Sequence, residues 1–338
     1  NNTIAKRTVK VNFKDVSKTY DTTTANPDIT GFVSDADAQV LNIDHTGIAQ
    51  ADPANNNKYK LQNLGGLTSN YGTGNTDASF NADPNAGDKD VQYEGLRTQM
   101  NNTLGTTDGA NYEFDVNGYG KGKIGKKTLN DGDVDFNFDP LKPVTKIYDG
   151  GRKVKYLESD KPADVKNYFT NAMWNGHNIL DSLEVDTAEY DNKNVNGGVV
   201  HNVKYTFKLS GANKNFKLAA DAKLEKQGTG IITKRDVTVT VKNPLTKQYD
   251  AGLAVKDTSG NVITGTALNN LVELTNLAGN DNATYTTTAV YTNKNVGTTR
   301  RVNYTLSIDG TNAGNYNLKY NGTDNNGNFH TDNNIIEK

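Results

Sequence analysis

The chain has 338 residues, 34% of them hydrophobic, and a formal net charge of −2 with acidic and basic residues interspersed. It contains no Cys, which excludes disulfide frameworks and Cys-based zinc sites. The balanced charge argues against nucleic acid as a partner, and no apolar run is long enough for membrane insertion. Abundant Gly and 17 Tyr indicate a polar, turn-rich chain that nevertheless folds.

The first two sequence markers from the N-terminus are an Ile followed by basic residues and a strand of the form apolar-x-Lys-x-Tyr-Asp. In an extended backbone the apolar residue, the Lys and the Tyr fall on one face, and the Asp suits a turn. The Ile marker occurs at Ile4, Ile124, Ile232 and Ile336. The strand occurs as Lys18, Tyr20 and Asp21, as Lys146, Tyr148 and Asp149, and as Lys247, Tyr249 and Asp250. We expect a strand that runs into a turn in each copy.

Two further markers follow in each third of the chain. A Lys-(Asn/Asp)-Val sequence predicts a hairpin turn at 89–91, 193–195 and 294–296. An Asn that precedes an aromatic residue occurs at Asn111, Asn215 and Asn315. Alternating β-branched and aromatic residues predict strands at 9–13, 134–138, 203–209, 237–241 and 302–308. Four markers in one order predict three homologous modules, at residues 1–126, 127–234 and 235–338.

The copies differ between their markers. The first has a Gly- and Asn-rich insertion at 55–86. Segments 165–174 of the second copy and 267–274 of the third could each form a short helix or an irregular strand, and the pattern does not decide between them. We expect an all-β fold, with three tandem β-sandwich-like modules, Ig-like or β-grasp-like, and room for one short helix in each. Short junctions predict an elongated rod, and the terminal Ile markers predict a piece cut from a longer array.

Taken together, the markers resemble the YDG and MBG-type repeats of large bacterial surface adhesins. The resemblance rests on Tyr148-Asp149-Gly150, on Lys294 to Gly297, on Gly314 to Leu318 and on the Ile markers. Two copies depart from the motif, with Thr22 and Ala251 in place of its Gly. The resemblance implies extracellular β-repeats on a bacterial cell surface, which form stalks or adhesive regions and have neighbouring repeats as partners.

No catalytic motif is present, and the four His residues do not recur between copies. The sequence therefore predicts no enzyme, no catalytic residue and no cofactor. Asp131, Asp133 and Asp135 alternate as calcium-loop donors do, but they lack the Gly and Glu of an EF-hand. We expect these Asp residues to form the solvent face of a strand, and we predict no metal site.

The repeated Lys allows two interpretations. In the ordinary one its stem packs along the following Tyr and its ammonium reaches water. In the other it forms an intramolecular isopeptide bond with Asn111, Asn215 or Asn315, which requires a buried, neutral Lys beside a carboxylic acid. As the repeated residues have scaffold positions, we regard them as a structural signature.

Aromatic residues outside the markers could stack on sugars. The candidates are Trp174, Tyr168, Phe169 and Tyr71, whereas Tyr20, Tyr148, Tyr249, Tyr205, Tyr304 and Tyr316 are expected to be core or half-buried strand residues. The leading hypothesis is a monomeric, non-catalytic stalk or spacer of a bacterial surface adhesin, which contributes to adhesion to host or matrix surfaces. The alternative is a module that binds carbohydrate or mucin-type glycans through variable loops of the first two modules.

Overall fold

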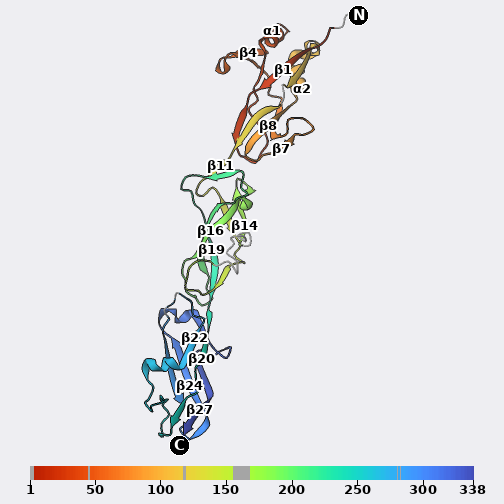
Figure 1. The fold of residues 1–338 in the computed structure, drawn as a ribbon. Helices are drawn as coiled ribbons and strands as arrows, with labels where there is room; N and C mark the ends of the chain where they lie inside the picture. Colours follow the sequence, from red (N-terminus) through yellow and green to blue (C-terminus); the bar gives the residue numbers. More distant parts are fainter. Residues whose placement is uncertain (1–3, 45, 117–118, 155–167, 280, 282) are drawn as a thin grey trace. The chain divides into compact units, whose positions relative to one another are not determined.

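A computed structural model describes residues 4–44, 46–116, 119–154, 168–279, 281 and 283–338 (Figure 1). The chain forms two compact units, and strands dominate both. The first unit comprises residues 1–133 and 209–222, and the second comprises residues 134–208 and 223–338. The predicted mostly-β fold class is therefore confirmed, whereas the division into three modules remains a prediction.

Where the structure describes the first unit, it forms two five-stranded sheets and one two-stranded sheet. The first sheet has the order β4 (Ala49–Asp52), β5 (Lys58–Leu61), β3 (Gly31–Val33), β1 (Arg7–Phe13), β9 (Tyr112–Val116). The second has the order β2 (Val16–Thr19), β10 (Gly120–Gly125), β8 (Gly87–Glu94), β6 (Thr68–Thr73), β7 (Asn81–Ala82). The third pairs β11 (Lys127–Leu129) with β18 (Phe216–Leu218). Short 3-10 turns lie at η1 (Pro53–Asn55) and η2 (Gly109–Asn111).

Two helices, α1 (Asp35–Asp44) and α2 (Leu96–Asp108), lie in the same part of the chain as β1 and β4 (Figure 1). Leu96, Met100 and Leu104 of α2 are spaced four residues apart, so they share one face of the helix. They join Val9 and Val11 of β1 in one buried cluster, to which α1 also contributes. The sequence left room for one short helix in each module, whereas this part of the chain holds two, of 10 and 13 residues.

The described residues of the second unit form four sheets. Two of them have the orders β12 (Asp135–Phe138), β14 (Phe169–Trp174), β15 (His177–Asn178), and β13 (Val144–Ile147), β19 (Leu224–Thr233), β17 (His201–Leu209), β16 (Leu183–Tyr190). The others have the orders β22 (Val272–Thr275), β20 (Arg235–Val241), β25 (Tyr316–Tyr320), β26 (Thr323–Asp324), and β21 (Thr246–Gln248), β27 (Asn328–Glu337), β24 (Gly297–Ile308), β23 (Tyr285–Tyr291). The 3-10 turns are η4 (Leu180–Ser182), η5 (Gly265–Leu271) and η6 (Gly310–Asn315).

The two segments that the sequence left open now have defined structures. Segment 165–174 contains the strand β14, although residues 165–167 lie outside the described residues. Segment 267–274 is divided between the 3-10 turn η5 and the strand β22. Each segment therefore contributes a strand to a sheet. Its short apolar run alone does not distinguish a strand from a helix.

One parallel pairing recurs three times. The strand that bears the Lys lies beside the strand that bears the next Ile, with Lys18 opposite Ile124, Lys146 opposite Ile232 and Lys247 opposite Ile336. All three Ile side chains are buried. The Lys and Ile markers of a copy are thus one structural element, although about a hundred residues separate them along the chain.

A second parallel pairing begins directly after the Ile marker. Lys127 pairs with Phe216, and Arg235 pairs with Tyr316, so the strand after each Ile lies against an Asn-aromatic marker. Only Lys126 separates β10 from β11, and only Lys234 separates β19 from β20. Because one residue connects the two strands in each case, the chain leaves one sheet and enters the next almost without interruption.

Candidate functional site

The repeated Lys and Asp close a small loop at the end of their strand. In the second copy, Lys146 Nζ lies 2.8 Å from Asp149 Oδ1 and donates to the carbonyls of Gly151 at 2.6 Å and Lys153 at 3.0 Å. Asp149 Oδ1 also accepts from the backbone N–H of Gly151 at 2.9 Å. Only 3% of the Lys146 side chain is exposed. The ammonium therefore binds one carboxylate and two backbone carbonyls of a tight loop.

The other two copies repeat this arrangement. The Lys–Asp distance is 2.8 Å in both the Lys18–Asp21 and the Lys247–Asp250 pairs. Each Asp Oδ1 accepts at 2.9 Å from the backbone N–H two residues on, which is an Asx turn. Burial raises the pKa of Asp21, but the Lys18 hydrogen bond and the Thr23 bonds outweigh it, and the net pKa lies below the usual value. The Lys and Asp thus act together as a structural clasp.

The residue after this Asp explains the Gly of the motif. Gly150 has a φ of 79°, and Thr22 and Ala251 adopt the same left-handed region at 72° and 59°. Gly enters this region without steric strain, whereas a Cβ makes it unfavourable by about 1–2 kcal/mol. The loop conformation is therefore kept in all three copies, even where the residue type departs from the motif.

A tyrosine from another strand lies beneath each ammonium. Lys18 Nζ is 5.4 Å from the ring centroid of Tyr71, and Lys146 and Lys247 lie 5.3 Å from the rings of Tyr190 and Tyr291, which is cation–π geometry. The expectation that the ammonium reaches water was wrong, because the loop carbonyls and this ring enclose it. The isopeptide hypothesis requires a Lys–Asn contact, but these ammonium groups bind the Asp and carbonyls of their own loops.

The Asn of the third copy binds the turn of the second. Asn315 is buried, its Oδ1 accepts from the backbone N–H of Val195 at 2.8 Å, and its Nδ2 donates to Asn194 Oδ1 at 3.0 Å. The turn is itself an Asx turn, in which the N–H of Asn194 donates to Asn192 Oδ1 at 3.0 Å. One amide side chain thus fixes the turn of the preceding copy to the start of the following strand.

A buried carboxylate joins the same two copies. Asp281 Oδ2 accepts from the hydroxyls of Tyr148 at 2.8 Å and Tyr316 at 2.5 Å, and its Oδ1 accepts from Asn312 at 2.9 Å. Its side chain is 1% exposed, and Lys193 Nζ lies 4.0 Å away. The rings of Tyr148 and Tyr316 meet edge to face at 5.4 Å. Sequence reasoning missed Asp281, because it lies in a loop that carries no repeated marker.

An equivalent junction lies in the first unit. Asn215 accepts from the backbone N–H of Ala86 at 2.8 Å and donates to Asn85 Oδ1 at 2.8 Å. Tyr20 meets Phe216 edge to face at 5.4 Å, as Tyr148 meets Tyr316. Because Phe216 has no hydroxyl, this junction lacks one of the two phenols that meet at the Asp281 carboxylate. We call both sets of contacts the Asn–Tyr junctions.

The first junction corrects the alignment of the turn marker. The predicted turn at 89–91 lies instead within the strand β8, where Val91 is buried and Lys89 pairs with Asp83 at 2.8 Å. The actual turn is formed by Asp83 to Gly87, and the N–H of Asn85 donates to Asp83 Oδ1 at 3.0 Å. The helix α2 lengthens the segment between this turn and Asn111, so the constant spacing that suggested 89–91 was misleading.

The repeated tyrosines are mostly in the core, as expected. Tyr148, Tyr205, Tyr304 and Tyr316 are buried, and Tyr20 is partly buried. Tyr249 is the exception, with 49% of its surface exposed. The rings of Tyr148 and Tyr20 each meet an aromatic ring edge to face, whereas Tyr249 keeps about half of its surface accessible.

The aromatic residues proposed to bind sugars do not form a surface platform. Tyr71, Phe169 and Trp174 are buried, and Tyr168 is half-buried. Tyr71 lies under the Lys18 ammonium, whereas Phe169 packs edge to face on Phe207 at 5.2 Å. A ring stacks on a sugar only when its face is accessible, so these three residues are core residues.

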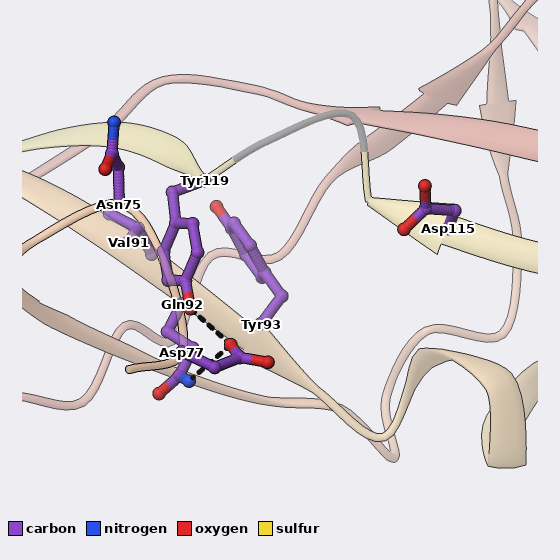
Figure 2. A pocket seen from close by; sticks show the side chains of 7 residues that line it. All are labelled: Asn75, Asp77, Val91, Gln92, Tyr93, Asp115 and Tyr119. Atoms are coloured by element: carbon purple, nitrogen blue, oxygen red, sulfur yellow. Dashed lines mark hydrogen bonds between the residues drawn. The ribbon is translucent and has the colours of Figure 1, made fainter. Parts of the chain in front are cut away.

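A cavity of about 320 Å³ opens in the first unit, beside the predicted insertion (Figure 2). Its lining consists of Asn75, Asp77, Val91, Gln92, Tyr93, Asp115 and Tyr119. The Tyr119 hydroxyl donates to Asp77 Oδ1, and Gln92 Nε2 donates to the same oxygen at 3.4 Å. Burial, followed by the Asp77 hydrogen bond, raises the pKa of Tyr119. Figure 2 shows the Tyr119 and Tyr93 rings beside these amide and carboxylate groups.

The remaining candidates form no reactive cluster in the described part of the chain. Among the residues placed there, no group of three His, Cys, Asp or Glu side chains could hold a metal ion. Asp133 instead accepts from the backbone N–H of Asn130 at 2.7 Å. His201 contacts Asp191 at 3.1 Å, whereas His45 lies outside the described residues. A search of the described residues also found no helix long and apolar enough to span a membrane.

The buried tyrosines predict a loss of stability at alkaline pH. Burial raises the pKa of Tyr291, and burial with the Asp281 hydrogen bond raises that of Tyr316, each to about 12 from the ordinary value of 10.0. Above pH 10 the unfolded chain loses phenolic protons that the folded chain retains, so the free energy of unfolding should fall between pH 10 and 12. Denaturation at several pH values, with tyrosinate absorbance as a second readout, tests this. A free energy independent of pH in that window would contradict it.

Comparison with known proteins identifies one region of the chain. Searches of curated proteins and of solved structures found no match. A family model matches residues 233–324, a region that contains the third Lys-x-Tyr-Asp strand and Asn315. The match ends before the strand β27, on which Ile336 lies. Residues 233–324 are therefore a YDG domain.

Proposed function

We propose that this chain is a non-catalytic structural segment of a bacterial cell-surface adhesin, in which three tandem modules act as a stalk or spacer. The observation that carries the proposal is the repetition of the Asn–Tyr junction. In each unit, an Asn amide from one copy binds the turn of the preceding copy. The repeated residues therefore serve connections between copies as well as the interior of each copy.

The energetics of the junctions support limited hinging. Each junction combines two amide hydrogen bonds with an edge-to-face aromatic pair, and the connecting strands are separated by one residue. Such hydrogen bonds and aromatic pairs contribute about 1 kcal/mol each. Several contacts released together make bending costly, which suits a spacer that holds a binding region away from a surface.

Small-angle X-ray scattering of the chain tests the stalk function. We expect the distribution of interatomic distances to have the long tail of a rod-like particle, because the junctions limit folding back. An Asn315→Ala variant should shorten this tail by freeing one junction, whereas Asn312→Ala should alter it less. A compact envelope for the unmodified chain would contradict the stalk function.

A second function is favoured by the cavity beside the insertion. Glycan-binding sites combine an aromatic ring with carboxylate and amide groups that bond sugar hydroxyls. The cavity brings together Tyr119, Asp77 and Gln92 from the first copy, which agrees with binding of a host or matrix glycan through variable loops. This proposal replaces Trp174 and the other core aromatics as candidate ligand contacts.

A glycan array tests this second function. We expect binding by the chain to be lost in Tyr119→Ala and strongly reduced in Asp77→Asn, which keeps the side-chain shape but removes the charge. Leu141→Ala serves as the matched control, because Leu141 is 89% exposed and lies in another part of the chain. Absence of binding by the unmodified chain, or equal binding by all three variants, would reject the cavity as a glycan site.

A further inference from the structure

Half of an Asn–Tyr junction recurs, uncovered, in the third copy. Tyr249 is 49% exposed, whereas its counterpart Tyr148 is fully buried against Tyr316. The turn at Asn295 and Val296 is also exposed, and Val296 has 39% of its surface accessible. Its Asx hydrogen bond is intact, because the N–H of Asn295 donates to Asn293 Oδ1 at 2.8 Å. This surface therefore has the conformation of an assembled junction but not its burial.

The complementary half lies in the first copy. Asn111 is exposed and precedes Tyr112, as Asn315 precedes Tyr316. The Tyr112 hydroxyl donates to Asp44 Oδ2, as that of Tyr316 donates to Asp281. Asp44 is exposed, whereas Asp281 also receives a second phenol from the preceding copy. This surface thus presents an amide and a carboxylate, two of the groups that the Asn–Tyr junctions use.

We propose that these two surfaces bind each other, so that a second copy of this chain docks head to tail. The Tyr249 hydroxyl of one chain donates to Asp44 of the second chain, as Tyr148 donates to Asp281 within one chain. Asn111 of the second chain accepts from the N–H of Val296 and donates to Asn295 Oδ1 of the first chain. Asn315 makes the same two bonds with Val195 and Asn194 within one chain. Lys294 then approaches Asp44 as Lys193 approaches Asp281.

The complementarity is specific to this occupant. A turn with an N–H donor and an amide oxygen meets an Asn, which offers one acceptor and one donor. The Tyr249 phenol would meet the Asp44 carboxylate, which already accepts from the Tyr112 phenol as Asp281 accepts from Tyr316. Two separate chains lack the covalent connection that holds neighbouring repeats of one chain together, so their association is weak in dilute solution. A test must therefore capture transient contacts.

Cross-linking of single-Cys variants provides this test, because the chain has no Cys of its own. One set of chains carries Val296→Cys, which keeps the backbone N–H of that residue, and the other carries Ala110→Cys next to Asn111; both positions are exposed. The two are mixed and treated with a short bis-maleimide. We expect cross-linked dimer in the mixture at several-fold the yield of either variant alone. A double variant, Val195→Cys with Gly314→Cys, leaves the Asn315 amide in place and puts the same pair of positions at the assembled junction. It should cross-link within one chain, which shows that the reagent spans the junction.

Specificity is tested by removing the phenol. Tyr249→Ala in the Val296→Cys chain should lower the dimer yield several-fold, whereas Val290→Ala, at another exposed side chain of the same repeat, should leave it unchanged. A mixture that yields no more dimer than the single variants, or insensitivity to Tyr249→Ala, overturns the proposal. The docking proposal rests on the tandem-module function proposed above, but an experiment can reject the docking without rejecting that function. A rod-like scattering profile with no cross-linking would retain the stalk and reject the docking.

Discussion

Replacing Lys146 by Ala should destabilise the second copy by about 3 kcal/mol, because it leaves a partly buried carboxylate and two loop carbonyls without their donor. The same change removes the cation above Tyr190. Urea denaturation followed by fluorescence measures this effect well, since the chain has one Trp and Trp174 is buried in the same copy.

The matched control for this change is Lys142→Ala. Lys142 also pairs with an Asp three residues away, at 3.5 Å, but 64% of its side chain is exposed. Exposed pairs of this kind contribute about 0–1 kcal/mol. Equal effects of the two substitutions would mean that the enclosed ammonium of Lys146 does not stabilise the loop.

Replacing Asp281 by Ala should lower the free energy of unfolding of the second unit by about 2–4 kcal/mol, because two buried phenols and one amide lose their acceptor. The loss should also uncouple the second copy from the third, since Tyr148 and Tyr316 belong to different copies. A single unfolding transition should then separate into two, which differential scanning calorimetry detects.

Asp281→Asn provides the control, because the amide oxygen still accepts a hydrogen bond and the shape is preserved. We expect it to retain most of the stability and one shared transition. If Asp281→Ala unfolds as the unmodified chain does, the carboxylate does not hold the two copies together.

The local structure of each copy could be predicted from sequence, whereas its long-range partners could not. The strands that bear Lys146 and Tyr316 follow from alternation and from the turn preference of Asp and Asn. Their parallel pairing with Ile232 and Arg235 depends on contacts far apart along the chain. Local propensity does not encode such contacts, so the repeated residues looked like the interior of single modules.

The errors at the candidate sites have identifiable causes. Tyr71 and Trp174 lie in variable segments, which suggested ligand contacts, but each fills a core position. Asp281 carries no repeat signal, because the junction that uses Phe216 has one phenol fewer. The cavity at Tyr119 and Asp77 brings together two loops, and only the folded structure shows that they meet.

The recurrent parallel pairing of the Lys-bearing and Ile-bearing strands has a mechanical consequence. The first of these strands lies near the start of a copy and the second closes it, so tension along the chain pulls them in opposite directions along their shared axis. The hydrogen bonds between Lys146 and Ile232 and their neighbours are then loaded in shear and must break together instead of one by one. If the chain is the stalk proposed above, each copy therefore resists stretching in the direction in which a force along the chain acts.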